Sequence, residues 1–297
     1  LQHAPGHAPA DDPRLRPGHA EYVKWAKWLL ANYSLNPGTI YAPPMPFTVE
    51  ELLEFVPLGL NHFTAFPAHS EYATDPNVAA YVKALDSHNL SQFATTYGYD
   101  ESDELDEMQA TFGQLKAAYP TIKTFTTAHM CGTPGDLAKP MVPCYGTCPG
   151  PMCRNGSNGV PVQDPVQIKR RNIDYMCPIL DWIRPENVSA CEKAGLDMWM
   201  YTSLEPWKNY TNILFHNALH EPRLLFWQVF QLQLTGFLYY DLCAWENKTV
   251  THKLIDGNAL TSPFISPLDW TPMQQDGGRD VGDGKLMCEF HHRNVTV

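Results

Sequence analysis

The feature that most restricts the fold of this chain is an alternation between two hydrophobic patterns. Short runs rich in β-branched and aromatic residues, typical of buried strands, alternate with segments that carry apolar residues every three or four positions, typical of helices. We count seven strand segments, which begin near residues 39, 61, 93, 121, 179, 197 and 237. Strands that alternate with helices form parallel sheets, so the sequence predicts an α/β fold.

A closed β/α barrel and an open doubly wound sheet both fit this alternation. The barrel needs eight strands, one more than we count. Because the chain opens with a helical segment near Glu21, the missing strand would be the first and would lie upstream of Leu1. The open sheet has less support, because we find no glycine-rich phosphate loop. We therefore predict a (β/α)8 TIM-like barrel that lacks its first strand in this chain.

Composition divides the chain into a short tail and one large domain. Residues 1–19 are rich in proline, histidine and alanine, which is typical of a tail or linker. Residues 20–297 carry the strand and helix patterns, interrupted at 131–164 by a loop insertion rich in cysteine, proline and glycine. A loop of this length is either functional or disordered, and its cysteines suggest that it is cross-linked.

Charge and sequence motifs place the chain in an oxidising compartment. The net charge is −11 without a basic block, which argues against a nucleic-acid partner. No apolar run reaches the roughly 18–20 residues of a membrane span. Repeated Asn-x-Ser/Thr sequons favour a secreted, extracellular or lumenal glycoprotein, with the lysosome included. The predicted glycosylation sites are Asn32, Asn89, Asn155, Asn187, Asn209, Asn247 and Asn294.

The cysteines agree with that compartment. All eight are candidates for disulfides, with a pairing that the sequence does not define: Cys131, Cys144, Cys148, Cys153, Cys177, Cys191, Cys243 and Cys288. Zinc binding by the crowded cysteines of the 131–164 loop is the alternative. We favour disulfides because the sequons indicate an oxidising space, and we expect no metal and no cofactor.

Two adjacent carboxylates stand where the third of these strand segments ends. Asp100 and Glu101 follow the apolar run that ends at Tyr97, and a helical pattern begins a few residues later. Barrel enzymes keep their chemistry at the carboxyl ends of their strands. Acidic residues before a helix can also have a purely structural role, because their negative charge interacts favourably with the positive end of the helix dipole. The position therefore makes the pair a candidate active site.

Several blocks of sequence follow one another in a recognisable order: Tyr97–Glu101, Leu180–Pro185, Gly195–Ser203, Glu221–Trp227, Gly236–Tyr240 with Trp245, and Gly282–Leu286. Together they resemble the catalytic barrel of glycoside hydrolase family 123, the β-N-acetylgalactosaminidase family, and its uncharacterised relatives. The resemblance implies a missing C-terminal segment as well, because such proteins usually continue beyond the last block with a closing helical segment. The cysteine-rich loop is an addition to the family pattern.

The resemblance also implies a mechanism. Most glycosidases flank the bond with two carboxyl groups about 5–10 Å apart, which neighbouring residues on one strand fit poorly. In substrate-assisted retaining catalysis, the oxygen of the sugar's own 2-acetamido group attacks the anomeric carbon in place of an enzyme carboxylate. Asp100 would orient that group, and Glu101 would protonate the leaving oxygen. The residues expected to bind the substrate are Tyr97, Tyr99, Asp181, Trp182, Tyr201 and Trp245.

Two functions remain open at this point. The first is a secreted glycoside hydrolase that removes terminal 2-acetamido-2-deoxy-β-hexosides, with GalNAc as the model sugar. The second is a catalytically silent glycoside-hydrolase-like domain that serves as a structural or sugar-binding part of an extracellular assembly. The expected partners are a carbohydrate, and the remainder of the parent protein or another chain that completes the barrel.

Overall fold

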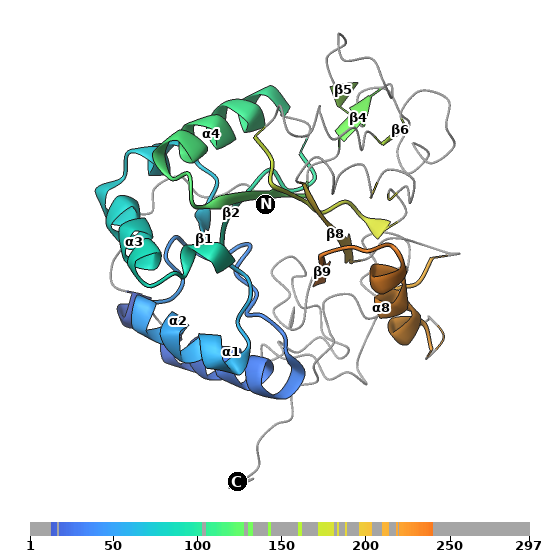
Figure 1. Cartoon of the computed structure of the whole chain (residues 1–297), viewed down its shortest axis with the longest axis horizontal. Helices are drawn as coiled ribbons and strands as arrows, with labels where there is room; N and C mark the ends of the chain where they lie inside the picture. The colour runs from blue at the N-terminus through green and yellow to red at the C-terminus, as the bar shows by residue number, and fades with distance from the viewer. Residues whose placement is uncertain are drawn as a thin grey trace, which may run out of the picture. The chain divides into compact units, whose positions relative to one another are not determined.

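The structure is a computed structural model (Figure 1), and its chain separates into two compact units, Leu1–Met176 with Ser189–Asp197 and Cys177–Val188 with Met198–Val297. It describes residues 13–16, 18–102, 105–127, 130–132, 142–143, 160–161, 172–180, 183, 188, 196–203, 210–213, 218 and 220–239.

The first unit is built on a parallel sheet. Its strands lie in the order β1 (Phe63–Pro67), β2 (Ala94–Tyr97), β3 (Lys123–Thr126) and β7 (Tyr175–Met176), and each pair of neighbours is parallel. Residues 63–66 of β1 and all of β2 are buried, as is usual for parallel strands in α/β proteins. The predicted α/β class with parallel strands is therefore confirmed. A closed barrel of eight strands stays a prediction.

Helices precede β1 and connect β1 to β2 and β2 to β3, and in Figure 1 they gather on one side of β1 and β2. They are α1 (His19–Tyr33), α2 (Val49–Phe55), α3 (Pro76–Ser87) and α4 (Leu105–Ala118), with the short 3-10 turns η1 (Pro13–Leu15), η2 (Val56–Leu58), η3 (Ser70–Ala73) and η4 (Ser91–Phe93). Thr48 and Glu51 cap α2 reciprocally, and the Asp75 side chain caps α3.

Phenylalanine side chains are prominent in the core of the first unit. The largest fully buried side chains include Phe47, Phe55, Phe63, Phe66, Phe112 and Phe125. Burial of each contributes on the order of 2–3 kcal/mol, so this core is a major source of stability. The Tyr81 hydroxyl donates to the Phe47 carbonyl at 2.8 Å, which satisfies the one polar atom that this tyrosine brings into the core.

The predicted strand at residues 39–42 is wrong. The chain makes a turn there, although Thr39 and Met45 hydrogen-bond to the β1 backbone at Thr64 and Ala65. Pro43, Pro44 and Pro46 follow in the sequence, and proline has no N–H with which to form a strand ladder. The segment therefore lies against β1 without becoming a strand.

The second unit contains a smaller parallel pair. β8 (Asp197–Thr202) and β9 (Gly236–Tyr239) are parallel, and α8 (Glu221–Gln231) lies between them in sequence. Trp199 is paired with Gly236, and a Cβ atom at Gly236 would come within 2.2 Å of the Trp199 indole. Trp199 therefore packs on the backbone of its neighbouring strand, which only glycine permits.

Three short strands lie in or beside the cysteine-rich insertion. β4 (Met130–Gly132) is antiparallel to both β5 (Val142–Pro143) and β6 (Val160–Pro161) in a sheet of order β5-β4-β6. The strand predicted at residues 178–183 does not form as predicted. The strand of this region is β7, which ends at Met176, and Ile179 forms only a single bridge with Tyr201. Among the described helices, none has the length and apolar character needed to cross a membrane.

Candidate functional site

The carboxyl end of β2 turns sharply to place Asp100. After Tyr97 the chain passes through Gly98, then Tyr99 with φ 59°, Asp100, and Glu101 with φ 45°. Left-handed backbone costs of order 1 kcal/mol or more for residues with a side chain, and such residues cluster at functional sites. Asp100 thus stands between two strained residues at the edge of the sheet where α/β proteins bind ligands.

Three hydroxyl groups hold the Asp100 carboxylate. Oδ1 accepts hydrogen bonds from the Tyr97 hydroxyl at 2.7 Å and the Thr127 hydroxyl at 2.6 Å. Oδ2 accepts one from the Tyr41 hydroxyl at 2.5 Å. The donors come from the 39–42 turn, the end of β2 and the residue after β3. We call Asp100 with these three residues the carboxylate cradle, and in it the Asp100 side chain still reaches solvent.

Tyr97 is the buried member of the cradle. Its ring lies edge-on to Phe125 and Tyr41, with centroids at 5.4 and 6.1 Å. Burial, and secondly the charge of Asp100, raise the pKa of the Tyr97 hydroxyl well above its ordinary value of 10. The hydroxyl therefore keeps its proton at physiological pH and serves as a donor to Asp100.

Gly98 allows the strands to approach one another beneath the cradle. The Ala68 amide donates to the Tyr97 carbonyl at 2.8 Å, and the Gly98 amide donates to the Phe125 carbonyl at 3.3 Å. A Cβ atom at Gly98 would lie 2.7 Å from the Ala68 Cβ, closer than carbon atoms pack. The glycine is thus required by the space that it leaves for Ala68.

The structure brings together only some of the predicted site residues. Glu101 is exposed beside Asp100. Tyr99 turns toward α4, where its hydroxyl donates to Thr111 at 2.8 Å, so it contacts that helix rather than the cradle. Tyr201 is buried in β8 of the second unit. Asp181, Trp182 and Trp245 lie outside the described residues.

Two cradle residues were not predicted from the sequence. Tyr41 falls in the segment that we interpreted as a strand, and no local pattern relates it to Asp100. Thr127 ends the predicted strand at 121–127, two residues after Phe125 and so on the same face. That spacing could have placed Thr127 beside Tyr97 once the pairing of β2 with β3 was known.

His62 forms a second polar group on this sheet, at the opposite end. It precedes β1, its Nε2 lies 3.1 Å from the Thr95 hydroxyl, and its ring contacts Phe125 and Tyr175 edge-on. Burial lowers its pKa from 6.5 to about 4, so the imidazole is neutral at physiological pH. Within the described part of the chain, no three His, Cys, Asp or Glu side chains converge as a metal site would require.

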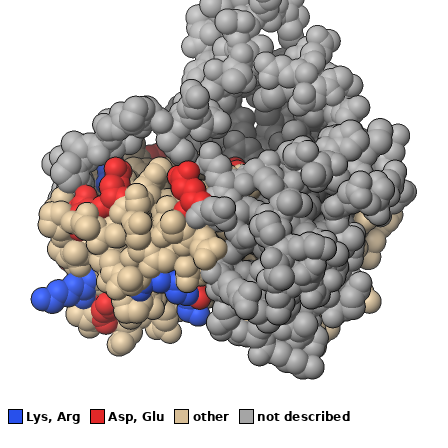
Figure 2. All heavy atoms as spheres, turned by 90° about the horizontal axis from the view of Figure 1, so that it is seen from above, with Lys and Arg blue, Asp and Glu red and all other residues tan. Residues whose placement is uncertain are grey.

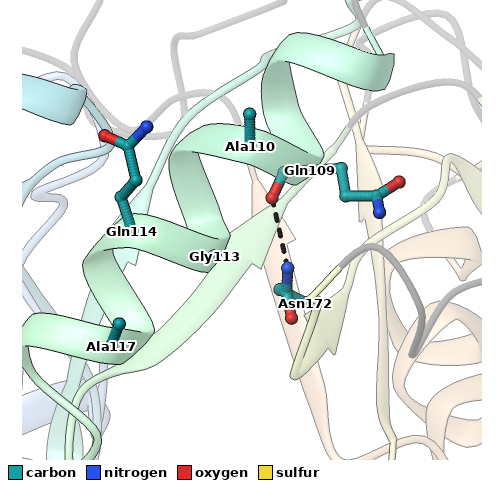
Figure 3. Close-up of a pocket in the computed structure, with 6 residues that line it drawn as sticks. All are labelled: Gln109, Ala110, Gly113, Gln114, Ala117 and Asn172. Carbon is teal, nitrogen blue, oxygen red and sulfur yellow. Dashed lines mark hydrogen bonds between the residues drawn. The ribbon is translucent and has the colours of Figure 1, made fainter.

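An open groove runs along α4, and Figure 3 shows the side chains that line it. The Asn172 amide donates to the Gln109 carbonyl at 3.1 Å and lies against Gly113, with Ala110, Gln114 and Ala117 along the same helix. None of these lining residues can ionise or act as a nucleophile. The groove therefore offers no catalytic chemistry comparable to that of the cradle.

A salt bridge joins α4 to the amino end of β7. Lys116 donates to Asp174 Oδ1 at 2.6 Å, while Asp174 Oδ2 accepts the Thr124 amide at 3.0 Å. These residues lie where β3 and β7 begin, the edge of a β/α sheet that usually serves stability. Both Asp174 oxygens thus have partners in the scaffold, and we assign Asp174 a structural role.

Most of the predicted modification sites lie outside the described side chains. Asn32 and Asn89 are exposed, as glycan acceptors must be, and Cys177 is buried. The remaining sequons and the side chains of the other seven cysteines lie in the part of the chain that is not described. Glycosylation and disulfide pairing therefore stay predictions.

Comparison with known proteins gave matches among solved structures alone. No family matches the chain, and no curated protein does. One similar structure is a protein from Silicibacter pomeroyi DSS-3 described as a glycerophosphoryl diester phosphodiesterase, at 14% identity and TM-score 0.30, covering 58% of this chain and 42% of that one. Another, from Galdieria sulphuraria, is described as a glycerophosphodiester phosphodiesterase, at 11% identity and TM-score 0.32, covering 59% and 52%.

This chain thus spans about half the length of these two proteins, and similarity at that level assigns no activity to it. The comparisons do correct the sequence-based assignment. The resemblance to glycoside hydrolase family 123 is wrong, since no family and no curated protein matches the chain. The predictions that depended on it, a β-N-acetylhexosaminidase, a silent glycosidase domain and carbohydrate binding, are withdrawn with it.

Proposed function

We propose that the chain is an enzyme that uses Asp100 for general acid–base chemistry on a small, uncharged or cationic substrate. The observation that carries the proposal is the carboxylate cradle, in which three hydroxyl donors from separate segments fix one exposed carboxylate. A carboxylate already held in place needs no reorganisation when a substrate arrives, and such preorganisation is a property of catalytic groups.

The cradle leaves Asp100 able to accept a further hydrogen bond. Oδ1 already accepts two, from Tyr97 and Thr127, whereas Oδ2 accepts one, from Tyr41. Two carboxylate oxygens offer about four acceptor positions. Because the side chain is exposed, an O–H or N–H group of a substrate, or a water molecule, can approach Oδ2 from solvent.

The charge at this edge selects the substrate class. Asp100 and Glu101 are adjacent and exposed, and the whole chain carries a net charge of −11. Figure 2 shows Asp and Glu side chains along the upper edge of the described part of this face, while most of the Lys and Arg side chains lie near its lower edge. Anionic substrates would be repelled from the carboxylates, whereas neutral or cationic groups would be accepted.

Hydrolysis is the reaction to test first, because water is the sole co-reactant that it requires. Asp100 would take a proton from water as the water oxygen bonds to the substrate carbonyl carbon, and the proton would then pass to the leaving group. General acid–base catalysis of this kind contributes about 10²–10⁴-fold in rate. The protonated Tyr97 hydroxyl would keep the carboxylate oriented throughout.

The experiment is a substrate screen of the purified chain with matched variants. Aryl esters, choline esters and aryl phosphodiesters represent neutral, cationic and anionic substrates, and the last matches the described activity of the two similar structures. We expect turnover of a neutral or cationic ester, and a loss of at least tenfold in Asp100→Asn. Glu50→Gln, which changes an exposed carboxylate on α2, should retain full activity.

Two results would contradict the proposal. Equal turnover by Asp100→Asn and the unchanged chain would remove Asp100 from the chemistry. Turnover of the phosphodiester alone would refute the substrate class, because it would show that the site accepts an anion. Circular dichroism of each variant distinguishes a lost activity from a lost fold.

A further inference from the structure

The outer face of α1 carries an exposed aromatic cluster. Trp25 and Trp28 meet edge-to-face at 5.4 Å between ring centroids, and Trp28 meets Tyr33 at 4.9 Å. Trp28 is 40% exposed and Tyr33 is 58% exposed. The buried residues of the same helix include Ala26, Leu29 and Leu30, whereas the three aromatic side chains of the cluster remain exposed to solvent in part. Contiguous exposed aromatic surface usually marks a site that binds a ligand, another protein or a membrane.

A glycosylation sequon lies within this cluster. Asn32-Tyr33-Ser34 ends α1, and Asn32 lies four residues after Trp28 and seven after Trp25, on the same side of the helix. Its Nδ2 donates to the Trp28 carbonyl at 2.9 Å, and both Asn32 and Ser34 are exposed. The atom that would carry a sugar is therefore directly beside the Trp28 turn.

We propose that Asn32 carries an N-linked glycan whose first sugar packs on Trp28 and Tyr33 and covers the aromatic cluster. The apolar C–H face of a pyranose complements the face of an aromatic ring, and the attachment point brings the two together without a further loss of translational entropy. The chain itself places the glycan over the cluster, because the Asn32 side chain and the rings of Trp28 and Tyr33 all lie at the carboxyl end of α1.

The modification is a group transfer from a lipid-diphosphate-linked oligosaccharide. The Asn32 Nδ2 forms a bond to the anomeric carbon of the sugar as the bond from that carbon to the diphosphate oxygen breaks. One amide proton is released, and the lipid diphosphate leaves. The second Nδ2 proton remains, so the hydrogen bond to the Trp28 carbonyl can persist after glycosylation.

The sequon at Asn89 provides a matched control within the same unit. Asn89 is exposed, but Leu90 and Ser91, which follow it in the sequon, are buried. No aromatic residue of the described exposed set is near Asn89 in sequence, in contrast to Asn32. The Asn89 sequon therefore lacks the neighbouring exposed rings that the Asn32 sequon has.

The test is hydroxyl-radical footprinting of the full chain secreted from a eukaryotic cell, with glycopeptide mass spectrometry to determine occupancy. Labelling of Trp28 and Tyr33 should be several-fold lower in the glycosylated chain than in Ser34→Ala, which removes the sequon and keeps Asn32. Trimming to a single N-acetylglucosamine should preserve the protection, and Ser91→Ala should leave labelling of the cluster unchanged. Asn32→Gln provides a second variant that also lacks the glycan.

Three outcomes would overturn the proposal. Asn32 without a glycan in a sample that carries one at Asn89 would show that the site is not used. Equal labelling of Trp28 and Tyr33 with and without the glycan would show that the sugar leaves the cluster uncovered. Protection in Ser34→Ala that grows with protein concentration would show that a second copy of the chain covers the cluster instead.

Discussion

The stability of the first unit should fall as the pH drops from 7.5 to 5, and His62 should account for a definable part of that loss. The imidazole has a pKa of about 4 in the folded chain and 6.5 when unfolded. Above pH 6.5 it is neutral in both states. Between pH 6.5 and 4 the unfolded chain binds a proton that the folded chain does not bind, so the free energy of unfolding decreases.

The size of the effect follows from the two pKa values. Each pKa unit corresponds to about 1.36 kcal/mol, so the full difference amounts to roughly 3 kcal/mol at pH 4 and roughly 2 kcal/mol at pH 5. Part of the His62 residue reaches solvent, but its ring is enclosed by Phe125 and Tyr175, and the ring sets the pKa.

Urea unfolding followed by circular dichroism at pH 7.5, 6 and 5 measures this contribution. The His62→Gln variant keeps a polar group toward Thr95 and cannot titrate, so its stability should fall less than that of the unchanged chain over this interval. The exposed His88→Gln variant serves as the control for losing an imidazole elsewhere. Parallel curves for the unchanged chain and His62→Gln would refute the reasoning.

Three further substitutions test the scaffold of the site. Thr127→Val removes one donor to Asp100 at constant volume and should cost about 1 kcal/mol in a urea titration; an unchanged midpoint would remove Thr127 from the cradle. Gly98→Ala should cost roughly 1–3 kcal/mol by overpacking against Ala68, measured by thermal unfolding, and a stable variant would contradict that clash. Lys116→Met removes a partly exposed ion pair to Asp174 and should cost no more than about 1 kcal/mol, so a larger loss would show that the pair is not screened by solvent.

Local signals in the sequence were sufficient for several elements. The capping box at Thr48 fixed the start of α2, and the β-branched run before Tyr97 placed β2 and therefore Asp100 at a strand end. In both cases the residues that determine the structure are neighbours in the chain. The expectation for residues 39–42 failed because the prolines that follow prevent a strand ladder, even though the residues themselves favour one.

The cradle could be predicted only in part, because its contacts are distant in sequence. Asp100 is 59 residues from Tyr41 and 27 residues from Thr127. Only the pairing of β2 with β3 and the turn against β1 bring these hydroxyls to one carboxylate. The mistaken family assignment has a related cause, since short blocks such as Tyr97–Glu101 describe a strand end and its turn, a pattern that an α/β chain of another family can share.

The most direct test of the account is a paired measurement of turnover and stability for Asp100→Asn, on whichever ester the unchanged chain hydrolyses. If Asp100 performs the chemistry, turnover should fall at least tenfold while the fold is retained, because an asparagine amide can still accept hydrogen bonds from the cradle but cannot take a proton. Full turnover in a variant with a lowered unfolding midpoint would contradict the account, since it would show that the cradle only joins three segments of the scaffold.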